Sequence, residues 1–158
     1  MLASAQATAS STWERVSDLD AWRGPAYWRI VASPYTYHWR YSPEHKDVYA
    51  LGMERQYTDR WLLGGAFFTN SFGQPSAYAY IGQRYDNLLD QPPLFFQWSF
   101  GILYGYTGKY ASKVPMNVQG FSPGALVGLG WQFDRNASVA FHLLGDAGVM
   151  LQFAYDLR

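Results

Sequence analysis

The sequence feature that most constrains the fold is a period of two, in which large apolar residues alternate with small or polar ones past residue 25. In the run 148–158, one face carries an apolar row and the other a mixed, partly charged row. The apolar row is Val149, Leu151, Phe153, Tyr155 and Leu157. Such a pattern is typical of a strand with lipid on one side.

Short polar or glycine-bearing connections divide the chain into segments of similar length. We expect strands near 27–41, 48–58, 61–70, 76–85, 94–107, 121–133, 137–145 and 148–158. Eight strands of roughly 9–14 residues make the smallest standard outer-membrane barrel, with short turns facing the periplasm and longer loops facing outward. The predicted fold class is therefore all-β, an eight-stranded antiparallel transmembrane β-barrel.

The composition excludes several other classes of protein. Charged residues make up 15% of the chain, against about 25% in an ordinary soluble domain, and aromatic residues 19%. The net charge is zero, so no basic excess indicates a nucleic-acid partner. The chain has no run of about 18 apolar residues, which excludes a transmembrane helix. It also has no Cys, which excludes disulfides and thiolate sites.

The N-terminal segment differs from the barrel, which we assign to residues 25–158. The small residues of 1–10 resemble the end of a secretory signal, so we expect a residual leader there. Over 11–24 a short amphipathic helix is predicted, with Trp13, Val16, Leu19 and Trp22 at steps of three. We expect this helix to lie in the membrane interface as a clamp. A frayed leader is the alternative.

Aromatic residues gather near the predicted strand ends, where rings of this kind meet lipid headgroups. They are Trp28, Tyr37, Trp39, Tyr41, Tyr57, Trp61, Tyr85 and Trp131. The alternative is a soluble eight-stranded barrel of the lipocalin kind, whose large residues line a ligand cavity. Its outer face would then be Ser, Gly, Ala and Gln, which is poor in charge for contact with water. The membrane barrel is favoured.

Three histidines are candidates for chemistry: His38, His45 and His142. None of them forms a pair with ligand spacing, so we expect no metal site and no cofactor. His142 is predicted on an inward face as a structural residue, and His45 in a charged, solvated loop. His38 lies near the outer end of the first strand. It stands among aromatic residues, where a lone His is more often a hydrogen-bonded structural residue than a catalyst.

The order of features resembles the outer-membrane lipid A palmitoyltransferases, the PagP family, in which an amphipathic helix precedes an eight-stranded barrel. Thr36-Tyr37-His38-Trp39-Arg40-Tyr41 is similar to the Thr-Trp-His-x-Arg-Phe-like segment that ends their first strand. Phe68-Thr69-Asn70-Ser71-Phe72 resembles the Phe-x-Asp-Ser-Trp-like end of their third strand, and Pro75 follows as a proline does there. The layout covers residues 11–158, and these two motifs are the residue-specific part.

The resemblance implies an acyltransferase of the bacterial outer membrane that moves a palmitoyl-type chain from a phospholipid to a hydroxyl of lipid A. Acyl transfer needs a base for the acceptor's proton and donors for the developing oxyanion. The catalytic residues would be His38 as base, with Ser71 and Asn70 as positioning or oxyanion groups. Arg40 would bind a phosphate. The implied partners are the phospholipid donor and the lipid A acceptor, around a membrane-embedded monomer.

One position departs from the family pattern: Asn70 stands where the family has Asp. A carboxylate can both orient an imidazole and stabilise its cation, whereas an amide can only orient it. Glu44 or Asp47 in the adjacent loop is a candidate for the missing charge. Otherwise the activity is expected to be slow, different or absent.

Small inward residues are expected to leave room for an acyl chain, with Gly82, Gly101 and Gly128 in contact with substrate and Gly82 as the floor by resemblance. Pro34 and Pro123 remove hydrogen-bond donors from strands, where a lipid could enter sideways. Two other functions remain open: a non-enzymatic small barrel that is lipid-binding or structural, and a lipid esterase with water as acceptor.

Overall fold

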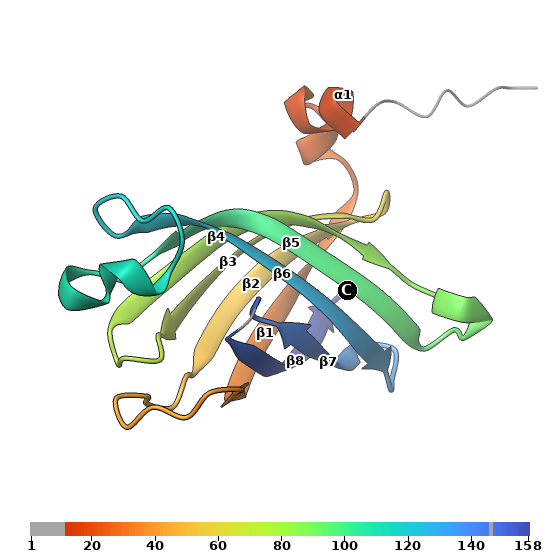
Figure 1. The fold of residues 1–158 in the computed structure, drawn as a ribbon. Helices are drawn as coiled ribbons and strands as arrows, with labels where there is room; N and C mark the ends of the chain where they lie inside the picture. The colour runs from red at the N-terminus through yellow and green to blue at the C-terminus, as the bar shows by residue number, and fades with distance from the viewer. Residues whose placement is uncertain (1–11, 146) are drawn as a thin grey trace, which may run out of the picture.

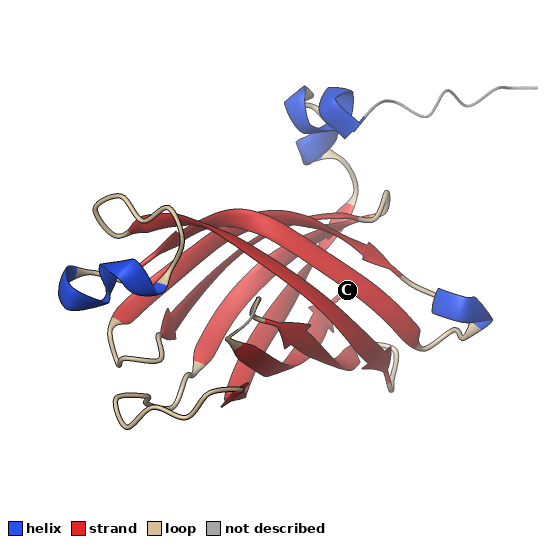
Figure 2. Cartoon of the chain, viewed as in Figure 1, coloured by secondary structure: helices blue, strands red, loops and turns tan. Residues whose placement is uncertain are grey.

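The computed structural model describes residues 12–145 and 147–158, so the predicted leader over 1–10 lies outside the described residues. Eight antiparallel strands close into a barrel in chain order, with the first also paired to the last (Figures 1 and 2). The strands are β1 Ala26–His38, β2 Ala50–Tyr57, β3 Trp61–Thr69, β4 Pro75–Tyr85, β5 Leu94–Tyr104, β6 Phe121–Gln132, β7 Ala137–Leu143 and β8 Gly148–Leu157. The predicted fold class and all eight strands are confirmed, with strand ends within three residues of those expected.

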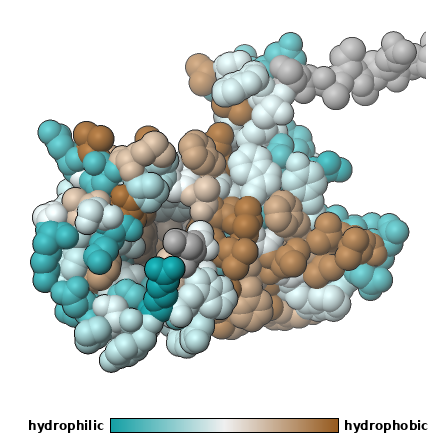
Figure 3. Space-filling model, in the orientation of Figure 1, coloured by the Kyte–Doolittle hydropathy of each residue, from teal (hydrophilic) through white to brown (hydrophobic). Residues whose placement is uncertain are grey.

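The two-residue period becomes an apolar outer wall. In β5, Phe100 and Ile102 point outward and are more than half exposed, while Gln97 and Ser99 point inward and are buried. Phe67 on β3 is 77% exposed. Figure 3 shows apolar residues over the barrel wall and hydrophilic ones toward its two ends. A soluble barrel would place its large residues inward, so that alternative does not apply.

The two ends of the barrel carry different connections. The α1 end, named for the helix beside it, has the connections 58–60, 86–93 and 133–136, and η2 Leu88–Asp90 lies in the second of these. The opposite end, which we call the His38 end, has 39–49, 70–74, 105–120 and 144–147. The 105–120 loop contains η3 Gly108–Lys113. The sites described below lie at the His38 end.

The predicted helix over 11–24 is broken into α1 Thr12–Ser17 and a single 3-10 turn, η1 Ala21–Arg23. The Ser17 hydroxyl donates to the carbonyl of Trp13 at 2.8 Å, and the Asp18 carboxylate accepts from the backbone N–H of Asp20 at 2.9 Å. Such local side-chain bonds compete with continued helix. In the part of the chain that the structure describes, no helix is long and apolar enough to cross a membrane.

Arg15 attaches α1 to the barrel. Its Nε lies 2.5 Å from the Asp59 carboxylate, and its guanidinium lies 4.3 Å from the ring centroid of Trp22. Trp22 in turn meets Tyr57 and Trp61 edge-on. These contacts bury Tyr57 and Trp61, which corrects their expected place in the exposed aromatic girdle. By contrast, Trp28, Tyr37, Trp39, Tyr41 and Trp131 are exposed as the girdle requires.

A buried polar network fills the interior near the α1 end. Arg29 on β1 donates to Asp156 at 2.6 Å and to Glu54 at 3.4 Å. Glu54 also accepts from the Tyr80 hydroxyl at 2.9 Å and from the Gln97 amide at 3.1 Å. Buried charges are tolerated when they are paired and hydrogen-bonded, as these are. This half of the interior is therefore closed by its own side chains.

Candidate functional site

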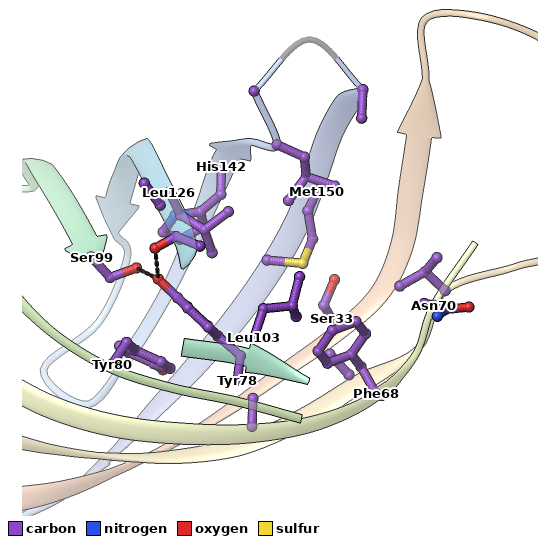
Figure 4. A pocket seen from close by; sticks show the side chains of 18 of the residues that line it. Ser33, Phe68, Asn70, Tyr78, Tyr80, Ser99, Leu103, Leu126, His142 and Met150 are labelled. Carbon is purple, nitrogen blue, oxygen red and sulfur yellow. Dashed lines mark hydrogen bonds between the residues drawn. The ribbon is translucent and has the colours of Figure 1, made fainter. Parts of the chain in front are cut away.

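Toward the His38 end the barrel interior contains a cavity of about 380 Å³, which we call the inner cavity (Figure 4). Its walls are largely apolar and include Val31, Val48, Phe68, Leu103, Leu126 and Met150. Glu54, Tyr80 and Gln97 of the polar network also border it. The volume falls within the range of about 300–1,000 Å³ that is usual for small-molecule pockets.

A second cavity of about 310 Å³, the vestibule, lies beside the inner cavity and shares five lining residues with it. The shared residues are His38, Ser71, Tyr106, Lys113 and Ala147. Arg40, His45 and Phe72 line the vestibule alone, and none of its lining residues within 12–145 and 147–158 is acidic. His38 and Ser71 therefore stand where an apolar space meets a cationic one.

A β-bulge explains why His38 faces the interior. Between the pairs Ala32–Phe153 and Tyr35–Leu151, two β1 residues, Ser33 and Pro34, lie opposite one residue of β8. The inward positions are Arg29, Val31 and Ser33 before the bulge, but Thr36 and His38 after it. Proline lacks the N–H that regular pairing would use. Without this extra residue the period of two would turn His38 toward lipid.

The His38 ring lies against the backbone of Ala147, and its Nε2 is buried with no hydrogen-bond partner among the described residues. A neutral imidazole with its proton on Nδ1 presents a lone pair on Nε2. A general base requires this tautomer.

Asn70 is fully buried, and its side chain organises the loop after β3. Its Oδ1 accepts from the backbone N–H groups of Phe72 and Gln74, both at 3.0 Å. Its Nδ2 donates to Gln74 Oε1 at 3.2 Å and to the Gly105 carbonyl at 3.1 Å. Both N–H donors are therefore used, which leaves Asn70 a positioning residue rather than an oxyanion donor.

Ser71 lies next to the hydroxyl of Tyr106, a residue that was not among the predicted site residues. The Ser71 carbonyl accepts from the backbone N–H of Lys46 at 2.8 Å, and its hydroxyl is hydrogen-bonded to that of Tyr106. Burial raises the pKa of the Tyr106 phenol, although the Ser71 bond partly offsets this shift. The phenol therefore keeps its proton at neutral pH and remains a donor.

Within the predicted strand 94–107, the period of two would place Tyr106 on the outward row with Phe100 and Ile102. The strand ends at Tyr104, and Gly105 follows with a φ of +137°, which side chains other than hydrogen rarely allow. A Cβ at this position would also collide with Ser76. The turn at Gly105 directs Tyr106 toward the cavities instead of toward lipid. A glycine at the end of the predicted strand is the signal that could have indicated this.

The remaining predicted site residues lie apart from the inner cavity. Arg40 lines the vestibule only. The Glu44 carboxylate lies 3.3 Å from Lys109 Nζ, and neither Glu44 nor Asp47 lines either cavity. Neither of these two carboxylates therefore takes the place of the Asp in the palmitoyltransferase pattern. Among residues 12–145 and 147–158, no group of three or more His, Asp or Glu side chains is placed to hold a metal ion.

Gly82, Gly101 and Gly128 point inward, but none of them lines the inner cavity. A Cβ at Gly128 would lie 2.6 Å from Nδ1 of His142, and Cβ atoms at Gly82 and Gly101 would collide with the backbone of the neighbouring strand. These glycines therefore permit close packing and do not open space. The small residues on the cavity wall are others: Ala50, Gly52, Ala66 and Gly124.

Comparisons with known proteins support the fold alone. No protein-family model matches the chain, and no curated protein matches it significantly. A de novo designed transmembrane β-barrel is similar, with a TM-score of 0.61 and 14% identity over 84% of this chain and 97% of that one. The Yersinia pestis outer membrane protein Ail, solved in a phospholipid bilayer nanodisc, has a TM-score of 0.44 and 13% identity over 84% of this chain and all of that one.

The structure of Ail from Yersinia pestis in complex with sucrose octasulfate, a heparin analogue, gives a TM-score of 0.42 and 13% identity, over 84% of this chain and 97% of that one. At such identities the likeness extends to the fold and no further. The closed barrel and its own exposed apolar wall indicate contact with lipid. The chain is an eight-stranded transmembrane β-barrel, as predicted.

Proposed function

We propose that this protein is an outer-membrane acyltransferase that moves a palmitoyl-type chain from a phospholipid to a hydroxyl of lipid A. One observation carries the proposal. An apolar cavity inside the barrel opens where His38 presents an unpartnered Nε2 beside the Ser71 hydroxyl. The cavity suits an acyl chain, and the two polar groups stand where the ester of that chain would lie.

The reaction follows from this placement. His38 Nε2 takes the proton of the lipid A hydroxyl as its oxygen attacks the ester carbonyl carbon. The hydroxyl pair of Ser71 and Tyr106 donates to the oxyanion that develops on the carbonyl oxygen. The intermediate then collapses, the bond to the glycerol oxygen breaks, and His38 returns the proton to that oxygen. The products are an acylated lipid A and a lysophospholipid.

The vestibule supplies binding for the headgroups. Arg40 and Lys113 line it, and no acidic side chain of the described residues does. Phosphate groups of the donor and the acceptor would neutralise these cations, and a guanidinium can bind a phosphate in bidentate fashion. The chain would thus be held by apolar contact in the inner cavity while the headgroup is held by charge outside it.

Two parts of the wall offer a route from the membrane. The pairing of β6 with β7 begins at Val127–Leu143, so the residues of β6 from Phe121 to Leu126 continue beyond its β7 partner. The pairing of β1 with β2 ends at Ser33–Ala50, next to Pro34. Pro123 lies in the first region and lines the cavity. We expect Pro34→Ala to slow the entry of lipid, and unchanged turnover would count against this route.

The second candidate is a non-enzymatic lipid-binding barrel. It is favoured by the neutral amide of Asn70, which uses both of its N–H donors within the loops and provides no negative charge for a protonated His38. A lipid esterase is the intermediate case, in which water replaces the lipid A hydroxyl.

The test is mass spectrometry of lipid A from Gram-negative cells that express the protein, beside His38→Ala. Tyr35→Phe is the matched control, because Tyr35 lies on the same strand and is exposed. Acyltransfer predicts a mass increase of one acyl chain in the wild type and the control, and none in His38→Ala. Free fatty acid without modified lipid A would identify the esterase. Neither product from folded protein would identify the lipid-binding barrel.

A further inference from the structure

His142 presents a second polar group to the inner cavity, near the end of β7. It lies on β7, is 3% exposed, and lines the cavity. Both of its ring nitrogens are buried without a hydrogen-bond partner among the described residues. Buried polar side chains in native proteins are nearly always hydrogen-bonded, so an exception calls for an explanation.

Several polar groups near this wall are already satisfied. The Tyr78 hydroxyl is within 3.2 Å of both the Ser99 hydroxyl and the Gly124 carbonyl. Glu54 is occupied by Arg29, Tyr80 and Gln97, as described above. Gly128 packs directly against the His142 ring and has no side chain to offer. None of these groups bonds His142, whose ring faces the contents of the cavity.

The sheet register fixes how deep His142 lies. On β8, Gly148 pairs with His38, and Met150 pairs with both Thr36 and His142. His142 is thus one inward position below the His38 row, roughly 7 Å along a strand. Figure 4 shows His142 and Met150 on one side of the cavity and Asn70 on the other. A group that meets His142 is a few carbons along a chain whose carbonyl lies at His38.

A neutral imidazole offers one N–H donor and one acceptor nitrogen. A hydroxyl matches either, because it can both donate and accept, whereas a methylene can do neither. We propose that His142 binds a hydroxyl on the acyl chain, so that the inner cavity prefers a chain hydroxylated about five carbons from its carbonyl over a plain one. This inference rests on the proposed function, since it assumes that the cavity holds an acyl chain.

The test measures displacement of a fluorescent fatty acid from the full-length barrel in phosphatidylcholine nanodiscs. The competitors are tetradecanoic acid and 6-hydroxytetradecanoic acid, for the wild type and for His142→Leu. Comparing the two proteins cancels the different partition of the two acids into the bilayer. The proposal predicts that the preference for the hydroxy acid falls about tenfold in His142→Leu.

Two further variants keep the result interpretable. His142→Gln, whose amide also donates and accepts, should retain most of the preference. Phe141→Leu changes the adjacent, outward-facing residue and should behave as the wild type. Equal preference in wild type and His142→Leu, with both acids displacing the probe, overturns the role of His142 but leaves the acyl-chain site intact. A probe that does not bind the wild-type barrel overturns both the inference and the proposed function.

Discussion

The two halves of the barrel interior share one wall and differ in what the inward positions carry. Near the α1 end these positions hold long charged side chains, including Arg29, Glu54 and Asp156, which bond to one another. Near the His38 end they hold Ala50, Ala66 and Val31, which leave the inner cavity between them. The outward face is apolar along both halves. The strand pattern is the same in both halves. The size and charge of the inward residues therefore decide which half is closed by a polar network and which half contains a cavity.

The first way to break this comparison is to remove a charge from the network. Glu54→Ala removes one of the two carboxylates paired with Arg29, and it removes the acceptor of Tyr80 and Gln97. Loss of one partner of a buried ion pair costs about 3–5 kcal/mol. We expect a decrease of this size in the free energy of unfolding, measured by urea titration in detergent. A decrease below about 1 kcal/mol would show that the network does not stabilise this half.

The second change acts on the loop that borders the inner cavity. Asn70→Asp removes the donors to Gln74 and to the Gly105 carbonyl, and places a carboxylate against that carbonyl. A buried polar group left unsatisfied costs about 1–3 kcal/mol, so we expect destabilisation of that order. It is measured in the same titration, with lipid A acylation followed in parallel. A stable and more active variant would mean that the loop readily accepts the family's Asp, contrary to our account.

The third change fills the cavity. Ala66→Phe introduces a ring into the cavity wall, whereas Ala79→Phe adds the same ring on the exposed outer face. We expect Ala66→Phe to lower acylation at least tenfold with little change in unfolding, because it excludes the chain without touching the network. Ala79→Phe should change neither quantity. Equal acylation by Ala66→Phe and Ala79→Phe would show that the inner cavity is not needed for the activity.

The smallest effect is expected outside the barrel. Arg15→Ala removes the contact with Asp59 and the guanidinium from the Trp22 ring. We expect a loss of about 1–2 kcal/mol in unfolding free energy, since the pair and the cation–π contact are partly buried. Arg23→Ala, which breaks an exposed ion pair with Asp20, is the control and should have no measurable effect. Equal stabilities would mean that α1 does not clamp the barrel.

The strands were predictable because a barrel wall with lipid on one side requires apolar residues at every second position. This alternation is visible in the sequence itself. The same period cannot reveal where it is interrupted. The bulge at Ser33 and Pro34 turns His38 inward, and Gly105 turns Tyr106 away from lipid. Proline inside a strand and glycine at its end were visible signals, but their effect on side-chain direction depends on the partner strand.

The alternation along each strand also could not predict which side chains bond to one another across the barrel. Arg29 and Asp156 are separated by most of the chain, and their bond exists because β1 and β8 close the sheet. Gly82, Gly101 and Gly128 were expected to leave room for an acyl chain. The sequence shows that these positions have no side chain, but it does not show which neighbouring atoms occupy the space. In the structure His142 packs against Gly128, and a neighbouring strand approaches each of the other two. The cavity instead lies beside Ala50, Gly52 and Ala66.

The most direct test of the central claim uses purified protein in vesicles that contain lipid A and a phospholipid with a labelled sn-1 chain. If the inner cavity and His38 carry out acyl transfer, label appears in lipid A in step with an equal amount of lysophospholipid, and His38→Ala abolishes both. If folded wild-type protein leaves all label on the phospholipid, or if His38→Ala transfers it at the wild-type rate, the account is contradicted.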